Sequence, residues 1–191
     1  GIAIINPETK SIYCNKAEGK LSKLKNKLQN TEIPGTVGIG HTRWATHGKP
    51  EVKNAHPHID SSGEVAVVQN GIIENYQELK IKLQKEGIVF NSDTDTEVIP
   101  HLIQKELFAL SQLKLENNGS TLLVAVRNVI SDLEGSYALA VIWSGAPDAL
   151  VVARKQAPLI IGLGEGEFIC ASDTPAIANF TKIILPLEDE E

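Results

Sequence analysis

The chain has 191 residues, of which 42% are hydrophobic and 22% charged, and its formal net charge is −6. This length and composition are typical of a soluble globular domain that buries its own core. The negative charge argues against nucleic acid and anionic membranes as partners, and no apolar segment reaches the length of a membrane span. The two cysteines, Cys14 and Cys170, argue against a disulfide framework and favour a reducing, cytoplasmic compartment.

The first half of the chain predicts strands joined by turns, with one short helix. Apolar runs bounded by turn residues predict strands over 1–6, 11–14, 37–39 and 64–68. Leucines at helical spacing over 21–28 predict an amphipathic helix before the third of these strands. The polar residues 45–63 predict a long loop, and Asn70-Gly71 after the fourth strand predicts a tight turn.

The second half begins with three predicted helices and ends in strands. Helical periodicity covers 73–86, 95–110 and 120–135. Gly87 is the expected C-terminal cap of the first helix, and Thr94 and Glu97 have the spacing of a capping box ahead of the second. The remaining predicted strands span 137–143, 149–153, 159–162, 168–171 and 182–185.

The order of these elements predicts the fold class. Successive strands joined by short turns imply mostly antiparallel sheet. About nine strands and three or four helices give an α+β protein, in which helices on the outer faces of two sheets would cover the core. No linker-like break interrupts the pattern, so we expect residues 1–191 to form one domain.

Neither a metal nor a cofactor is expected. Four histidines lie close together in the sequence, at His41, His47, His56 and His58. No Cys or Glu completes a zinc site among them, so loop histidines that make hydrogen bonds are the favoured interpretation. The glycines of 162–166 are too closely spaced for a dinucleotide-binding fingerprint, and a strand follows them instead of a helix.

Three other features together predict a site for an amino acid. Arg43 is suited to bind a carboxylate, and Asp95 can receive an ammonium group. The Asn70 amide and the backbone N–H of Gly71 could form an oxyanion hole for acyl transfer. Taken singly, each feature has a structural alternative: an ion pair for Arg43, a plain turn for Asn70-Gly71, and a helix cap for Asp95. Together they describe a zwitterion with a reactive side-chain carbonyl, and glutamine fits this description.

At these residues the chain resembles a known family. The similarity is carried by the runs 41–48, 54–58, 70–75, 92–98, 134–138, 158–164 and 171–173. These runs resemble the glutaminase domain of glucosamine-6-phosphate synthase, a class II glutamine amidotransferase domain of the N-terminal-nucleophile type. Amidophosphoribosyltransferases and asparagine synthetases have the same combination of Arg, Asn-Gly and Asp, but they resemble this chain less.

The resemblance implies a fold, a reaction and a set of partners. The fold is a four-layer αββα sandwich with two mostly antiparallel sheets. The reaction is hydrolysis of L-glutamine to glutamate and ammonia, which passes to a C-terminal sugar isomerase domain that makes glucosamine 6-phosphate from fructose 6-phosphate. The full-length enzyme of the family is expected to be a homodimer.

The resemblance also implies residue roles. Arg43, Thr46, His47 and Asp95 are expected to bind glutamine, and Trp44 is expected at the mouth of the site. Asn70 and Gly71 are expected to form the oxyanion hole.

The chain departs from the family at its first residue. The family begins at a cysteine whose thiol attacks the glutamine amide, with the α-amine of the same cysteine as base. Gly1 aligns instead with the family's second strand, so we expect an N-terminally truncated domain that lacks the nucleophile and the sugar isomerase domains. Such a chain would be inactive alone. The alternatives are a non-catalytic glutamine-binding or regulatory module and the glutaminase domain of another class II amidotransferase.

Overall fold

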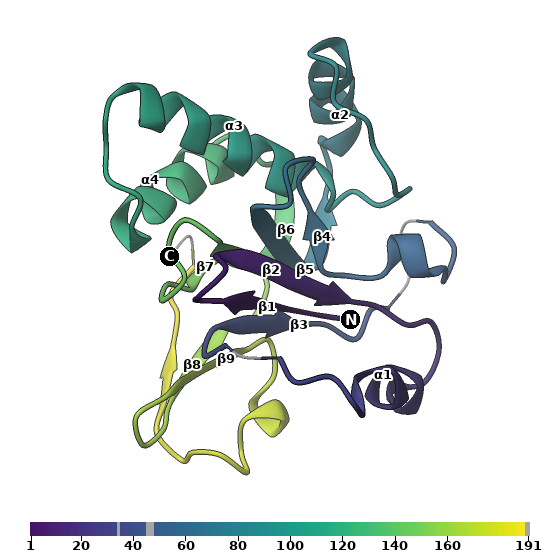
Figure 1. Ribbon diagram of the computed structural model, residues 1–191, viewed down its shortest axis with the longest axis vertical. Helices are drawn as coiled ribbons and strands as arrows, with labels where there is room; N and C mark the ends of the chain where they lie inside the picture. Colours follow the sequence, from purple (N-terminus) through teal and green to yellow (C-terminus); the bar gives the residue numbers. More distant parts are fainter. Residues whose placement is uncertain (34, 45–47, 190–191) are drawn as a thin grey trace.

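The computed structural model describes residues 1–33, 35–44 and 48–189, which form strands and helices in an α+β arrangement (Figure 1). The strands are β1 (Ile2–Asn6), β2 (Ser11–Asn15), β3 (Gly38–Gly40), β4 (His58–Ile59), β5 (Val65–Ile73), β6 (Gly135–Trp143), β7 (Val151–Lys155), β8 (Ile160–Leu163), β9 (Phe168–Ala171) and β10 (Ile184–Pro186). The helices are α1 (Leu21–Leu28), α2 (Tyr76–Lys85), α3 (Val98–Gln112) and α4 (Gly119–Ile130), with short 3-10 turns η1 (Val52–Asn54) and η2 (Thr174–Ala176).

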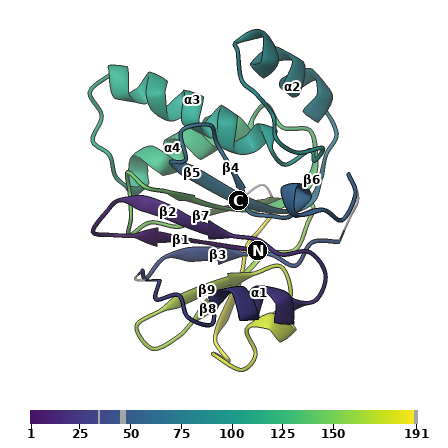
Figure 2. The ribbon, with the colours of Figure 1, turned by 45° about the vertical axis from the view of Figure 1, so that its right-hand side comes forward.

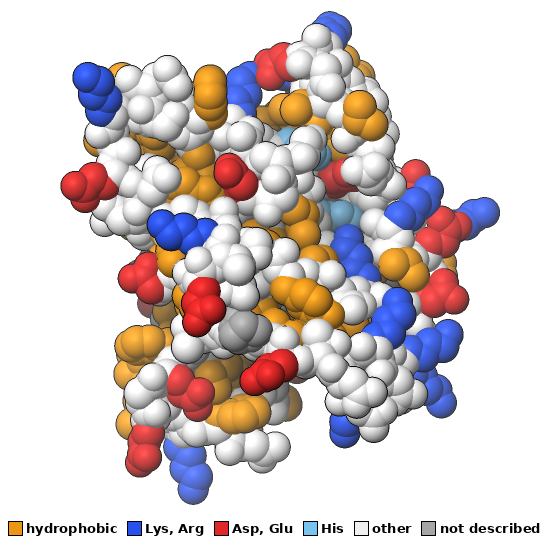
Figure 3. Space-filling view, in the orientation of Figure 1, with side chains coloured by type: hydrophobic (Ala, Val, Ile, Leu, Met, Phe, Trp, Pro, Cys, Tyr) orange, Lys and Arg blue, Asp and Glu red, His pale blue; other side chains and the backbone are white. Residues whose placement is uncertain are grey.

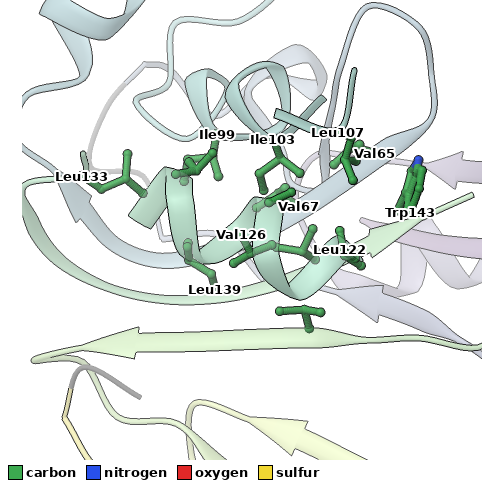
Figure 4. Packing of buried hydrophobic residues seen from close by; sticks show 14 of the residues in the cluster. Val65, Val67, Ile99, Ile103, Leu107, Leu122, Val126, Leu133, Leu139 and Trp143 are labelled. Carbon is green, nitrogen blue, oxygen red and sulfur yellow. The ribbon is translucent and has the colours of Figure 1, made fainter. Parts of the chain in front are cut away.

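A four-stranded antiparallel sheet, in the order β4-β5-β6-β7, forms the centre of the molecule. Its longest ladder pairs β5 with β6 from Val65 opposite Trp143 to Ile73 opposite Gly135. The helices α3 and α4 cover one face of this sheet, and their apolar side chains interdigitate with those of β5 and β6 (Figure 4). Figure 4 shows Ile99, Ile103 and Leu122 among the side chains of this core. The alternation of strand side chains therefore directs Val65 and Val67 toward the helices.

The other face of the central sheet packs against a second strand layer. Ala3, Ile5 and Ile39 of the sheet β2-β1-β3 contact Ala66 and Val68 of β5. The sheet β10-β8-β9 lies beside β3 in both ribbon views (Figures 1 and 2). The α1 helix and the segment with η2 lie on the far side of this layer (Figure 2). The layers therefore run helices, sheet, strands, helix, which confirms the predicted α+β sandwich of antiparallel sheets.

Two of the local predictions that differ from the structure concern the loop over 45–63 and the start of α3. The polar residues predicted as one long loop over 45–63 contain the short strand β4, which pairs with β5 through His58 opposite Val67. The predicted capping box at Thr94 and Glu97 does not form, because α3 begins only at Val98 and no side chain caps it. Glu97 instead accepts hydrogen bonds from the backbone N–H groups of Asn91 and Ser92, at 2.7 and 2.6 Å. The carboxylate thus fixes the loop that precedes Asp95.

The surface carries charges of both signs, and Figure 3 shows Lys and Arg side chains gathered over α1. Four of the lysines lie in and next to this helix: Lys20, Lys23, Lys25 and Lys27. Over the described ranges, every helix is too short or too polar to cross a membrane.

Candidate active site

Asn70 and Gly71 lie within a strand, and the tight turn predicted there is wrong. The strand β5 continues to Ile73, with Asn70 opposite Ala138 and Gly71 opposite Tyr137. Gly71 has a φ of +130°, and a Cβ at this position would collide with the backbone carbonyl oxygen of Ser136. Glycine is therefore needed here because it lets the backbone of β5 approach β6 this closely, and not because the chain turns at this position.

The strand alternation places the Asn70 side chain on the side of the second strand layer. Ala66 and Val68 point to that side, while Val65 and Val67 point to the helices. Asn70 continues the first series, and its side chain is exposed. Gln69 continues the second series and is buried at 3% exposure. The side chain of the oxyanion candidate Asn70 is therefore exposed, whereas that of its neighbour Gln69 is buried.

Arg43 enters the site from the segment that follows β3. Its guanidinium donates to the carbonyl oxygens of Lys49 and Gly48, at 3.1 and 3.2 Å. Partial burial lowers the pKa of Arg43, and the charge of Asp95 opposes that effect. A guanidinium stays protonated in either case, so the group is a fixed positive charge at neutral pH.

Two carboxylates that precede α3, those of Asp93 and Asp95, have different surroundings. Asp95 is 3% exposed, and its Oδ2 accepts a hydrogen bond of 2.8 Å from the backbone N–H of Ile73. Asp93 instead forms an exposed ion pair with Lys53, at 2.9 Å, and accepts a hydrogen bond from Asn54. Only Asp95 is therefore tied to the end of β5, next to Asn70 and Gly71.

The residues predicted from the sequence meet at one cavity of about 340 Å³. Its lining includes Arg43, Trp44, Asn70, Gly71 and Asp95. The Trp44 side chain is 89% exposed, and its place at the mouth of a glutamine site stays a prediction from the family resemblance. The other two residues assigned to the site, Thr46 and His47, lie outside the described residues. A cavity of this size is large enough for an amino acid.

The sequence reasoning assigned no role to four polar residues that line this cavity: His41, Thr42, His56 and Gln69. His41 stacks on His56, with 4.5 Å between ring centroids, and His58 meets His56 edge-on at 4.8 Å. Burial lowers the pKa of His41 to about 4 and that of His58 to about 3. His41 and His58 are therefore neutral at pH 7, and of the three histidines His56 and His58 make side-chain hydrogen bonds. The only signal in the sequence was that the histidines lie close together along the chain. The sequence favoured loop histidines that make hydrogen bonds, and the hydrogen bonds of His56 and His58 agree with that interpretation. Over the described residues, no group of three or more His, Cys, Asp or Glu side chains could hold a metal ion.

Neither cysteine has the character of a nucleophile. Cys14 lies in β2 and Cys170 in β9, and burial raises the pKa of both thiols. Both thiols are therefore protonated at neutral pH, and the thiolate is the reactive form. Cys170 lines a second cavity of about 700 Å³ between the strand layers, which Asn70 also lines. Arg43 and Asp95 do not belong to that lining.

Comparison with known proteins identifies relatives of the whole chain. The family model described as a glutamine amidotransferase domain matches residues 41–179. A glutamine–fructose-6-phosphate aminotransferase (isomerizing) from Thermosynechococcus vestitus is 56% identical over 191 residues, which are 100% of this chain and 29% of the relative. A protein of the same name from Methanothermobacter thermautotrophicus is 48% identical over 191 residues, 100% of this chain and 30% of that protein. The chain thus spans less than a third of the length of these relatives.

A solved structure has the same fold. The glutamine phosphoribosylpyrophosphate amidotransferase from B. subtilis superposes with a TM-score of 0.74 at 26% identity, over 98% of this chain and 38% of that protein. The family model covers most of the chain, and it includes each residue that lines the candidate cavity. The chain therefore belongs to the glutamine amidotransferase domain family, and its nearest similarity among the relatives named above is to glutamine–fructose-6-phosphate aminotransferases.

Proposed function

We propose that this chain is the glutamine-binding, glutaminase part of a glutamine–fructose-6-phosphate aminotransferase. The observation that carries the proposal is the cavity at which Arg43, Asn70, Gly71 and Asp95 meet. These residues come from three separate segments of the chain, and a guanidinium, a carboxylate and an amide beside a backbone N–H are groups that glutamine fits. The names of the relatives support the same reaction, since glutamine is their stated nitrogen donor.

The cavity offers a complementary group for each part of glutamine. Asp95 accepts hydrogen bonds from the substrate ammonium, and Arg43 binds the α-carboxylate, so both charges of the zwitterion are neutralised. Thr46 and His47 add contacts to the substrate, and Trp44 covers the mouth. At the far end, the Asn70 amide and the Gly71 backbone N–H stabilise the negative charge that develops on the amide oxygen during attack.

The attacking group is the missing part of this mechanism. The family resemblance implies a cysteine thiol with a nearby amine as base, and such a thiol has to reach the carbonyl carbon held at Asn70 and Gly71. Cys14 and Cys170 are protonated thiols outside the lining of the site. We therefore propose that residues 1–191 by themselves bind glutamine without hydrolysing it.

The proposal extends to the surroundings of the domain. The released ammonia passes to a sugar isomerase domain, which converts fructose 6-phosphate into glucosamine 6-phosphate. The complete enzyme is a homodimer in the cytoplasm. The length of the relatives supports a further domain, because the match covers only 29% of the first relative described above.

Titration calorimetry of the 191-residue chain with L-glutamine tests the binding step. The wild-type chain is expected to bind L-glutamine and to discriminate against D-glutamine. Asp95→Asn keeps an acceptor for the Ile73 N–H but removes the charge, so the dissociation constant should rise about tenfold or more, since a hydrogen bond to a charged group contributes about 1.5–3 kcal/mol. Asp93→Asn is the matched control, because this carboxylate is outside the cavity lining and should change the affinity less than threefold. Equal effects of the two variants would contradict the assigned site.

A second experiment separates the glutaminase assignment from a purely regulatory glutamine-binding module. Ammonia release is measured with the 191-residue chain alone and with a longer protein of the same gene that begins with a cysteine. Hydrolysis by the longer protein alone supports the glutaminase part. Ammonia release by the 191-residue chain that Asn70→Ala abolishes would show that these residues contain their own nucleophile. Absence of hydrolysis in both would favour the regulatory module.

A further inference from the structure

Three buried residues, of which His56 and Gln69 also line the cavity, form a closed ring of hydrogen bonds at β5. The backbone N–H of Gln69 donates to His56 Nδ1 over 3.3 Å, and His56 Nε2 lies 3.3 Å from the hydroxyl oxygen of Thr96. That hydroxyl donates to Oε1 of Gln69 over 2.7 Å, which closes the ring. The exposed fractions of His56, Gln69 and Thr96 are 4%, 3% and 0%, so bulk water does not compete for these bonds.

The ring requires one protonation state of His56. A backbone amide can only donate, so Nδ1 must accept with its lone pair and the hydrogen of the imidazole must be on Nε2. The Nε2–H group then donates to the oxygen of Thr96, whose single hydrogen goes to Gln69. Asp95 Oδ1 lies 3.5 Å from the same hydroxyl and is the weaker acceptor. The neutral Nε2–H tautomer therefore satisfies all three bonds at once.

The surroundings of His56 favour this neutral form. Burial is the largest effect, and it lowers the pKa of His56 well below 6.5. The neighbouring groups with positive or potential positive charge act in the same direction: His58, His41, Arg43 and Lys16. A second proton would place an N–H group on Nδ1, directly against the N–H of Gln69. Protonation would thus break the ring at the bond that holds the backbone of β5.

The ring joins the two segments that carry the candidate binding residues. Gln69 directly precedes Asn70 on β5, and Thr96 directly follows Asp95 in the segment ahead of α3. The bond of 2.8 Å from the Ile73 N–H to Asp95 is a second connection between the same segments. The ring and this bond therefore set how far Asp95 lies from Asn70.

We propose that His56 and Thr96 are positioning residues which, acting through Gln69, fix the spacing between Asp95 and the Asn70–Gly71 pair. The inference rests on the proposed function, because the spacing matters only if one glutamine molecule spans both groups. Its ammonium binds at one end and its side-chain amide at the other. A substrate held at both ends is sensitive to small displacements of either end, so loss of the Thr96 hydroxyl, which is outside the cavity lining, weakens binding without removing any group that lines the cavity.

The tautomer of His56 is the first test, and it needs no ligand. In the ¹⁵N-histidine-labelled 191-residue chain, two-bond proton–nitrogen correlation spectra distinguish a protonated ring nitrogen from an unprotonated one. We expect His56 to show a protonated Nε2 and an unprotonated Nδ1 throughout the range from pH 6 to 8. A protonated Nδ1 in this range would overturn the proposal.

The second test compares three variants by backbone amide shifts and by glutamine affinity. Thr96→Val keeps the shape of the side chain but removes the hydroxyl, whereas Thr96→Ser retains it. Thr94→Val is the matched control, because Thr94 is equally buried and its hydroxyl bonds His58 over 3.0 Å, outside the ring. Thr96→Val should shift the amide signals of Asn70 and Gly71 and raise the dissociation constant for L-glutamine about tenfold, whereas the other two variants should change it less than threefold.

The possible outcomes separate the inference from the function on which it rests. Equal effects of Thr96→Val and Thr94→Val, or unchanged Asn70 and Gly71 amides in a folded Thr96→Val chain, overturn the positioning role. Failure of the wild-type chain to bind L-glutamine overturns the proposed function instead, and the tautomer and the amide shifts then still decide whether the ring couples the two segments. If Thr96→Val does not fold, the tautomer in the wild-type chain decides.

Discussion

Replacement of Gly71 by alanine tests the explanation given for the Asn70–Gly71 pair. Gly71 has a φ of +130°, a region that L-residues with a side chain rarely adopt, and its missing Cβ leaves room for the carbonyl oxygen of Ser136 on β6. Alanine therefore meets two separate obstacles, an unfavourable backbone conformation and a collision with backbone that belongs to the longest ladder of the central sheet. The matched control is Gly63→Ala, because Gly63 has a φ of +79° but no atom lies within 4 Å of the position that a Cβ would take there.

Both substitutions place a side chain in an unfavourable backbone conformation, but only Gly71→Ala also causes a collision with neighbouring backbone atoms. An unfavourable φ costs about 1–3 kcal/mol, which both variants should lose. Overpacking against atoms that cannot move costs about 1–3 kcal/mol more, and only Gly71→Ala incurs it. We therefore expect Gly71→Ala to lose about 2–6 kcal/mol of unfolding free energy and Gly63→Ala about 1–3 kcal/mol. For a domain of this size, the additional loss corresponds to a further decrease in Tm of about 2–4 °C for each kcal/mol.

Urea unfolding of the two variants and the wild-type chain, followed by far-UV circular dichroism, measures these differences at constant m-value. The same spectra show whether the sheet persists in the folded state. If Gly71→Ala loses no more stability than Gly63→Ala, the close approach of β5 to β6 does not require glycine. The Asn70–Gly71 sequence would then need an explanation from substrate binding alone.

Three further predictions concern the core, the histidines and the tryptophans. Leu122→Ala should lower the unfolding free energy by about 2–5 kcal/mol because Leu122 is fully buried, while Leu123→Ala, at a position 46% exposed, should stay within about 0.5 kcal/mol; urea unfolding measures both. Burial lowers the pKa of His58 from 6.5 to about 3, so the unfolded chain binds more protons below pH 6.5, and the stability contributed by neutral His58 is lost as the pH falls from 6.5 toward 3. His58→Gln should therefore flatten the dependence of unfolding free energy on pH between 6 and 4 by up to about 1.4 kcal/mol per pH unit, and an unchanged slope would contradict the low pKa. Trp44→Phe should abolish any change in tryptophan fluorescence on addition of L-glutamine, because the remaining Trp143 is 6% exposed and belongs to the core between the central sheet and the helices.

Local sequence patterns were sufficient to predict most of the elements. The leucines of α1 and the apolar periodicity of α3 and α4 identified those helices, with ends that differ by a few residues. The strands of the C-terminal half were also found, because each is a short apolar run between turn residues. Such patterns report which face of an element is buried, and burial by the rest of the chain is what stabilises these elements here.

The errors arose where tertiary contacts overruled local chemistry. Asn70-Gly71 has the sequence of a turn, but pairing with β6 keeps it in a strand. Thr94 and Glu97 have the spacing of a capping box, but the hydroxyl of Thr94 bonds His58 and the carboxylate of Glu97 bonds the loop before it. In each case the competing partner is more than a helical turn away in the sequence or belongs to another element. No local pattern can therefore reveal it.

The charged residues of the candidate site were predictable from the sequence, but the hydrogen bonds that hold them in position were not. Arg43 and Asp95 were identified because their side chains match the two ends of a zwitterion, and the structure brings both to one cavity. The ring that involves His56, Gln69 and Thr96 was not foreseeable, because its members come from three segments that only the fold brings together. Hydrogen-bond direction, which depends on three-dimensional placement, is the information that the sequence lacks.

The electrostatics of the cavity lead to a prediction about the class of ligand that it should prefer, a zwitterion. Asp95 is 3% exposed, and a carboxylate at that depth needs hydrogen-bond donors or a positive charge to offset its lost hydration. The Ile73 N–H supplies one donor, and Arg43 is near enough for the Asp95 charge to act on its pKa. A ligand with a single charge would be complementary to one of these two charged groups, whereas a zwitterion is complementary to both. An amino acid brings an ammonium to Asp95 and a carboxylate to Arg43 together, so replacement of either protein group should lower the affinity for glutamine more than it lowers the affinity for a simple amide such as propionamide.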